Sequence, residues 1–355
     1  MGNTDYPKKN FLSAQIDLSK FRSLSDEEKQ SKEKIAPHST YIRDAFRKFR
    51  KNPIGMMALG IIVFVLLLVL LSAFFCPYDY DEILAINEVR DITAKNLPPF
   101  TYSEREIAAI ADGAKIFPHI FGTDELCRDY FSRVMAGTRI SLFIGVFASI
   151  IVLVIGSLYG SISGLAGGKV DMIMMRVVDI IYSLPDMLLV ILLSMIIGSI
   201  FPKNGSGLIS RLGANMVSLF IVFALLYWVS MARLVRGQIL SIREQDYVKA
   251  ARMIKTPASR MIFKYILPNC ISIILISATM QIPSAIFTES YLSFVGLGVQ
   301  APMPSLGALA NAARSSMQLY PYKLIFPSLM IALIVLSFNL LGDALRDAFD
   351  PKQKQ

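Results

Sequence analysis

The residue types that most often carry catalysis or bind metals are few in this chain and lie far apart. The histidines are His38 and His119, and the cysteines are Cys76, Cys127 and Cys270. Their spacing matches neither a metal-ligand cluster nor a disulfide framework. No nucleophile, base and orienting residue come together along the sequence. We therefore expect no catalytic residue, no metal site and no cofactor, and we interpret the cysteines as buried or unreactive thiols.

The stretch "GLAGGKV" is the nearest approach to a phosphate-binding loop. The glycine that should stand five residues before Gly168 is missing, and Val170 occupies the place of the serine or threonine that would bind Mg²⁺. We predict that this chain does not bind or hydrolyse ATP itself.

Four polar residues stand inside apolar stretches and are candidates for a pathway or gate. Asp186 follows Pro185, and an aspartate near the centre of a membrane helix costs about 2.5 to 3.5 kcal/mol. It should face protein or water, either as a pathway residue or as a carboxylate hydrated where the proline opens the helix. Glu289 is either an outer gate residue or a hydrated charge at the bilayer rim. Gln281 and Asn339 either line the pathway or hydrogen-bond between helices.

These residues require membrane-spanning helices to position them. The chain has 355 residues, 54% of them hydrophobic, and a mean hydropathy of +0.51, which is typical of an integral membrane protein. A bilayer core of about 30 Å needs about 20 helical residues, and runs this long exclude a barrel. We predict an all-α integral membrane protein with six transmembrane helices, at 54–76, 140–168, 177–202, 212–232, 265–288 and 324–342.

The distribution of positive charge predicts the orientation of these helices. Most of the 36 Lys and Arg residues fall before residue 54, in 233–264 and after 342, so we place both termini and segment 233–264 in the cytoplasm. The net charge of +9 is explained by these loops, and we expect no nucleic-acid partner. The glycine-rich stretch 290–313 contains two prolines and is predicted to be a re-entrant or external hairpin.

The remaining segments are assigned from composition. A polar N-terminal segment of mixed charge cannot order itself, whereas the next has one apolar and one basic helical face, as interfacial helices do. We divide the chain into a flexible cytoplasmic tail 1–39, an interfacial amphipathic helix 40–53, the first transmembrane helix 54–76, an extracytoplasmic loop 77–139, a five-helix core 140–342 and a cytoplasmic tail 343–355. Within the loop, Thr123 is expected to cap a helix whose first turn holds Asp124 and Glu125.

The cytoplasmic segment 233–264 contains a proline-broken basic stretch between two apolar runs. Tyr247, Val248, Ala251 and Ile254 recur at helical spacing and predict a short helix over 246–255. A second helix is expected to begin at Thr256, followed by proline. Composition alone leaves two interpretations of this segment, an anchor on the membrane surface or a docking element for a partner protein.

Five motifs then resemble one family. "YVKAARMIKTPASRMIFKYILPN" is similar to the signature loop of binding-protein-dependent ABC importer permeases, with Lys249 in place of glutamate and Lys255 in place of glycine. The turn is therefore expected to move to Pro257. "FGTDELCRDYFSRVMAGTRISL" resembles the entry to the second span of the C-type permeases of oligopeptide, dipeptide and nickel importers, with Cys127 where glycine is usual. "RLVRGQIL", "ESYLSFVGLGVQAPMPSLG" and "FNLLGDALRDAFDP" fit the same family.

The resemblance implies a type I ABC importer permease fold in a bacterial plasma membrane. It further implies four kinds of partner: a homologous B-type permease in a heterodimer, two cytoplasmic ABC ATPases that hydrolyse ATP, an extracytoplasmic substrate-binding protein, and a peptide substrate. The signature loop would be the coupling helix on one ATPase, with Ala250 and Ala251 in the contact. The residues assigned to coupling are Asp246, Tyr247, Lys249, Ala250, Ala251, Ile254, Lys255 and Pro257.

Two other functions are compatible with a multi-span protein. A secondary transporter or channel would need charge relays or broken helices in paired positions. Asp186 is the only feature in the sequence that could belong to such an arrangement. A membrane sensor would use the 77–139 loop to bind a ligand and the cytoplasmic segment to signal. Copurification with two ATPases and a second permease would separate both from an importer subunit.

Overall fold

The structure is a computed structural model that describes residues 41–86, 89–200, 214–299 and 303–349. The predicted tail 1–39 and the last residues of the chain lie outside this part. The chain divides into two compact units, Met1–Phe46 and Arg47–Gln355, and helix α2 (Tyr41–Lys51) crosses the division. The elements described below belong to the second unit.

Five helices among the described residues are long and apolar enough to cross a membrane. A sixth span results if the bent pair formed by α6 (Gly168–Ser183) and α7 (Asp186–Ile200) counts as one. The mostly helical fold therefore agrees with the predicted all-α membrane protein. The five helices are Pro53–Phe75 (α3), Tyr130–Ala166 (α5), Asn215–Ile242 (α9 and α10), Ala258–Val295 (α12 and α13) and Tyr322–Phe349 (α15).

Several predicted boundaries differ from the structure. α5 begins at Tyr130, because Asp129 caps it by accepting the backbone N–H of Ser132 at 2.8 Å. The prediction of Thr123 as the cap was wrong, since Asp124 instead closes a turn onto the backbone N–H of Arg128. The third span is sharply bent at Pro185. α15 continues to Phe349, into the predicted C-terminal tail.

Two of these membrane helices contain a π-helical turn, where one extra residue is accommodated. The turn Phe223–Tyr227 joins α9 (Ala214–Val222) to α10 (Trp228–Ile242). The turn Met261–Ile266 joins α12 (Ala258–Arg260) to α13 (Leu267–Val295). α13 ends at Gly296, whose φ of +90° permits the left-handed turn toward α14 (Leu306–Ala313).

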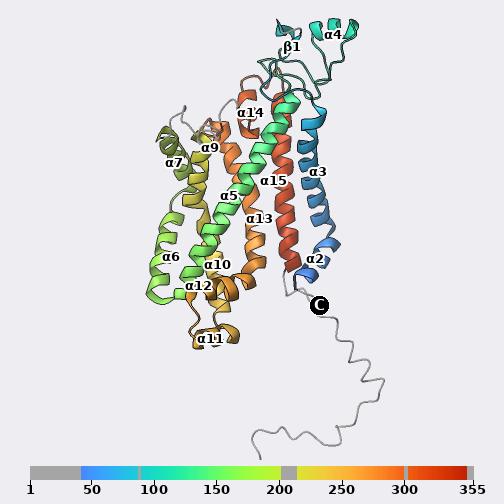
Figure 1. The fold of residues 1–355 in the computed structure, drawn as a ribbon. Coiled ribbons are helices and arrows are strands. Elements are labelled where there is room, and N and C mark those ends of the chain that lie inside the picture. The colour runs from blue at the N-terminus through green and yellow to red at the C-terminus, as the bar shows by residue number, and fades with distance from the viewer. Residues whose placement is uncertain (1–40, 87–88, 201–213, 300–302, 350–355) are drawn as a thin grey trace, which may run out of the picture. The chain divides into compact units, whose positions relative to one another are not determined.

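Close packing of α5 against α10 forms the centre of the second unit (Figure 1). Gly156, Gly160 and Gly164 recur every four residues on α5, and each faces α10. A Cβ atom on Gly160 would lie 2.5 Å from the carbonyl oxygen of Ala232. Small residues at this spacing let membrane helices approach to backbone contact. On other faces α5 also packs against α13 and α3.

Figure 1 shows the segment between α3 and α5 at one end of these helices and α11 (Asp246–Met253) at the other. The first segment contains a short hairpin, β1 (Ala85–Ile86) antiparallel to β2 (Val89–Arg90), with Ala85 opposite Arg90. Next come a 3₁₀ turn, Ile92–Ala94, and α4 (Glu104–Ala111). Ser103 and Glu106 form a reciprocal capping box at the start of α4.

Candidate functional site

α11 has one face buried in its own chain and one face open. Val248 (0% exposed) and Ala251 (4%) belong to the same buried cluster as residues of α10 and α13. On the open face lie Met253 (85% exposed), Ile254 (76%) and Tyr247 (42%). Large apolar side chains exposed in such a group mark an interaction surface. The predicted short helix therefore exists, and its apolar open face is well defined.

Of the residues assigned to coupling, Ala251 is covered by the chain itself, so Ala250 is the alanine available to a partner. Met253 was missed by the sequence analysis. Tyr247, Ala250 and Ile254 are spaced so that they share one face of a helix, and this spacing could have indicated the exposed face that Met253 adjoins. The remaining assigned residues are also exposed: Asp246, Lys249, Lys255 and Pro257.

The corner after α11 retains the left-handed conformation for which a glycine is usual. Lys255 has a φ of +54°. Its backbone N–H donates to the carbonyl of Arg252 at 2.9 Å, and that of Thr256 donates to the carbonyl of Ala251 at 3.2 Å, the pair of bonds that defines a Schellman C-cap. The prediction that the turn moves to Pro257 was wrong. Pro257, and not Thr256, is the residue that precedes α12.

Ion pairs hold α10, the helix that leads into α11, against α6. Arg236 binds both carboxylate oxygens of Asp171, and Ser163 of α5 donates to the same carboxylate. One turn away, Arg233 pairs with Asp179 at 2.8 Å. The Asp171 pair is bidentate and partly buried, which makes it the stronger of the two. These contacts tie α5, α6 and α10 together on the helix that leads into α11.

A pocket of about 490 Å³ lies between the α6–α7 bend, the π-helical turn at Tyr227, and α13. Gln281 lines it, together with Ser284, Tyr182 and Pro185. Its polar groups are uncharged hydroxyls and one amide. The structure thus brings the predicted Gln281 to the same cavity as the proline that precedes Asp186.

Asn339, another predicted pathway residue, does not line this pocket. Asp186 begins α7, but its side chain lies outside what the structure describes. Asn339 is exposed on α15. Gln281 and Asn339, singled out as one group, therefore occupy separate places.

Glu289 lies in a cage of serine hydroxyls and is fully buried (0% exposed). Ser293 donates to Oε1 at 2.7 Å and Ser141 of α5 donates to Oε2 at 2.9 Å, with Ser290 at 3.4 Å. The interpretation of a hydrated charge at the bilayer rim was wrong, because no solvent reaches this carboxyl group. The hydroxyls replace water as hydrogen-bond donors.

The serines of this cage also hold the chain that follows α13. The hydroxyl of Ser293 accepts the backbone N–H of Val299 at 3.2 Å, and Ser305 donates to the same oxygen at 3.1 Å. The hydroxyl of Ser141 accepts the backbone N–H of Leu306 at 3.4 Å. Glu289 therefore connects α13, α5 and the start of α14 through one network.

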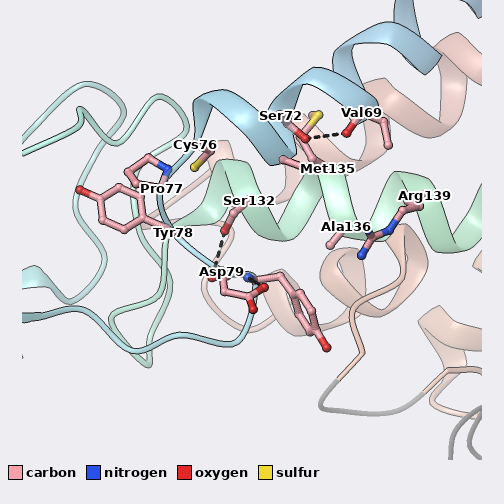
Figure 2. Close-up of a pocket in the computed structure, with 12 residues that line it drawn as sticks. Val69, Ser72, Cys76, Pro77, Tyr78, Asp79, Ser132, Met135, Ala136 and Arg139 are labelled. Atoms are coloured by element: carbon pink, nitrogen blue, oxygen red, sulfur yellow. Dashed lines mark hydrogen bonds between the residues drawn. The ribbon is translucent and has the colours of Figure 1, made fainter.

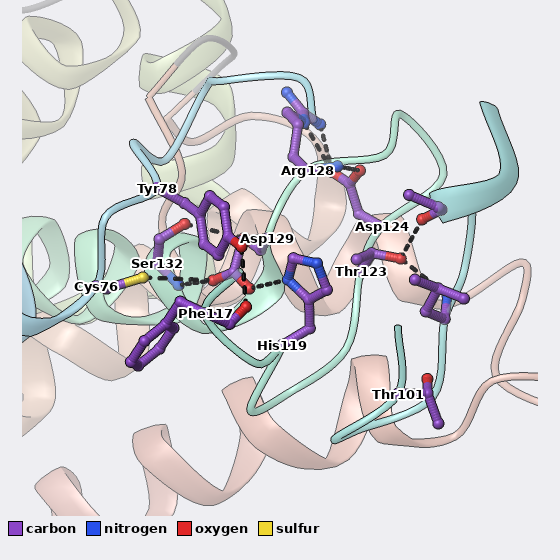
Figure 3. A network of polar contacts seen from close by, with 12 residues as sticks. Cys76, Tyr78, Thr101, Phe117, His119, Thr123, Asp124, Arg128, Asp129 and Ser132 are labelled. Atoms are coloured by element: carbon purple, nitrogen blue, oxygen red, sulfur yellow. Dashed lines mark hydrogen bonds and ion pairs between the residues drawn. The ribbon is translucent and has the colours of Figure 1, made fainter. Parts of the chain in front are cut away.

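His119 is the second buried polar centre, in the segment between α3 and α5 (Figure 3). It is 0% exposed, with Nδ1 at 2.8 Å from Asp129 and Nε2 at 2.9 Å from Glu106. Burial by itself would lower the pKa of His119, but the hydrogen bonds to Asp129 and Glu106 outweigh it and raise the pKa to about 9. The ring of Tyr78 lies 5.1 Å from the imidazole.

This histidine links the cap of α5 to the capping box of α4, because Asp129 and Glu106 are the residues that form those caps. Sequence analysis treated it as isolated. The acidic partners stand ten and thirteen positions from His119. Irregular chain separates them from the histidine, so the spacing carries no information about contact. Its geometry indicates a structural staple.

Residues 153–355 match the family "Binding-protein-dependent transport system inner membrane component". The chain belongs to this family. The permease also matches the N-terminal membrane domain of oligopeptide transport permease C over residues 40–99. The resemblance predicted from the motifs is confirmed, and the permease is a multi-pass membrane protein.

Relatives of the permease are named as peptide transport components. It is 38% identical to an oligopeptide transport system permease, OppC of Bacillus subtilis, over 91% of this chain and 94% of the relative. It is 38% identical to the dipeptide permease DppC of the same organism, over 90% and 88%. It is 40% identical to the glutathione permease GsiD of Pectobacterium atrosepticum, over 66% and 73%.

Both positions at which the motif resemblance leads us to expect glycine keep a glycine-like backbone. Cys127 has a φ of +60° and is 1% exposed, and Lys255 has a φ of +54°. A side chain in this region costs about 1 kcal/mol or more. The permease therefore retains the turns while carrying side chains that strain them.

Proposed function

We propose that the permease forms half of the translocation pathway of an ATP-driven importer of oligopeptides or dipeptides. The other half would be a homologous B-type permease. Two cytoplasmic ATPases would hydrolyse ATP, so that this subunit has no catalytic role, and an extracytoplasmic substrate-binding protein would deliver the peptide. The oligopeptide and dipeptide permeases among its relatives support the substrate class.

The coupling role is supported by the contrast between the buried face and the exposed face of α11. Val248 and Ala251 fasten the helix to the permease, whereas Tyr247, Met253 and Ile254 are left for a partner. Basic side chains surround this apolar patch, which fits a groove with an acidic rim. Coupling between two sites needs an element whose position both sites bias. A helix fixed on one face and docked on the other meets that requirement.

The test is Ile254→Asp, which puts a charge into the docking face without touching the buried side of α11. We expect the ATPases to be lost on purification and peptide uptake to fall at least tenfold. Ile107→Asp is the matched control, because Ile107 is also exposed (58%) but lies on α4. Normal copurification and uptake in the Ile254 variant would overturn the coupling assignment. Replacing Ala251 is less informative, because it perturbs the permease's own core.

The pocket around Gln281 supports a place on the substrate path. Its amide and hydroxyl groups can hydrogen-bond peptide amides without selecting a side-chain charge. Gln281→Trp should fill part of this space and lower uptake about tenfold while ATPases still copurify. Leu275→Trp on the exposed face of the same helix (47% exposed) serves as control. Equal uptake in both variants would remove the pocket from the path.

A further inference from the structure

A second pocket, of about 320 Å³, lies where α3 ends and α5 begins (Figure 2). Its apolar wall is formed by Val69 and Ala73 of α3 and by Met135 and Ala136 of α5. The remaining wall is polar and includes residues that follow α3: Tyr78, Asp79 and Tyr80, with Arg139 of α5. The pocket thus passes from apolar to polar at the ends of two membrane-crossing helices.

Two opposite charges line this pocket and do not pair with each other. Asp79 and Arg139 are both exposed. Among the residues that the structure describes, neither has an ion-pair partner within 4.0 Å. Within the described part of the chain, the Asp79 carboxylate accepts just the backbone N–H of Tyr80, at 2.7 Å. A ligand that satisfies both residues must carry a separated anionic and cationic group.

The surroundings of the pocket are those of a lipid-facing surface. Leu70, Phe74 and Phe75 at the end of α3 are 62%, 85% and 69% exposed. Tyrosine and arginine at the ends of membrane helices are placed at the level of the lipid head groups. An acyl chain could therefore lie along the apolar wall while its head group enters the polar part.

We propose that this pocket binds one phospholipid with a primary-amine head group, such as phosphatidylethanolamine. The guanidinium of Arg139 binds the phosphate, for which its fork of N–H donors is suited. The carboxylate of Asp79 accepts hydrogen bonds from the ammonium group. A free peptide also carries both charges, but it has no need of the exposed apolar side chains beside the pocket. The Gln281 pocket lies among other helices, so the two sites are separate.

Native mass spectrometry of the purified assembly tests the proposal after exchange into defined lipid. The probes are phosphatidylethanolamine, phosphatidylglycerol, which has the phosphate but no amine, and phosphatidylcholine, whose amine has no N–H. We expect preferential retention of phosphatidylethanolamine by the natural chain. Arg139→Gln should reduce that retention roughly tenfold, as expected for loss of a charge-assisted hydrogen bond. Asp79→Asn should abolish the preference over phosphatidylglycerol while leaving a lipid bound.

Arg314→Gln is the matched control, because Arg314 is exposed, follows α14 and does not line the pocket. Thermal unfolding of each variant checks that the fold is intact. Retention unchanged in the Arg139 variant, or equal retention of all three lipids by the natural chain, would overturn the proposal. So would displacement of the lipid by a dipeptide, or by water-soluble glycerophosphoethanolamine as readily as by the intact lipid.

Discussion

Replacing Glu289 with glutamine should weaken the permease more than any conservative change on its surface. The carboxyl group of Glu289 accepts a hydroxyl hydrogen bond on each oxygen, from Ser293 on Oε1 and from Ser141 on Oε2. A glutamine amide has one oxygen and one NH₂ group, so the serine that faces the NH₂ group can only accept from it and loses the acceptor for its own O–H. Its hydroxyl is then left unsatisfied in a buried site.

The loss of one hydrogen bond to a carboxylate, with a buried hydroxyl unpaired, costs about 1.5 to 3 kcal/mol. Glu289→Ala leaves a cavity as well, and we expect about 3 to 5 kcal/mol from both effects together. The two neighbouring serines provide an internal comparison. Ser293→Ala removes a 2.7 Å bond and an acceptor for Val299, whereas Ser290→Ala removes only a 3.4 Å contact.

The assay is chemical unfolding of the purified assembly in detergent, followed by peptide uptake in vesicles. Stability should decrease in the order natural chain, Ser290→Ala, Ser293→Ala, Glu289→Ala, with Glu289→Gln close to Ser293→Ala. Uptake should fall with stability, because the network holds the start of α14 on α5. If Glu289→Gln unfolds like the natural chain and the two serine variants are indistinguishable, the hydrogen-bonded cage does not stabilise the fold.

Three further changes test other contacts. The pKa of His119 is raised to about 9, so its contribution of about 3 kcal/mol to stability is fully present below pH 6.5 and lost as the pH rises through 9. In His119→Gln the melting temperature should therefore depend less on pH across this range. An unchanged pH dependence would contradict the structural role of His119. Lys255→Gly should raise the melting temperature by relieving about 1 kcal/mol of left-handed strain, whereas a lower value would argue against that strain. Asp171→Asn should destabilise the assembly by about 2 kcal/mol, because Arg236 loses a charged partner; Asp179→Asn, at a more exposed pair, is the control and should change little.

Much of the helical framework could be predicted from the sequence, because runs of apolar residues have few alternatives in lipid. The short helix α11 followed from side-chain spacing alone. The exact ends of the long spans did not, since Asp129 is the cap of α5 only because the turn at Asp124 and Cys127 places it there. Composition places a span, but local hydrogen bonds decide where it begins.

The buried polar centres were the least predictable part of the structure. Glu289 was recognised as unusual, yet its donors come from Ser141 on another helix and from serines on its own. Serine is common in membrane helices and gives no sign of its partner. His119 was dismissed as isolated for the same reason. Contacts across elements depend on how helices are rotated, which a single sequence does not state.

The glycines of α5 have a mechanical consequence. Where two backbones touch, as at Gly160 and Ala232, no flexible side chain lies between the helices to absorb a displacement. Sliding would require the pair to separate first. A displacement of the end of α10 that leads into α11 is therefore transmitted directly to α5, so that the two helices move as one rigid body.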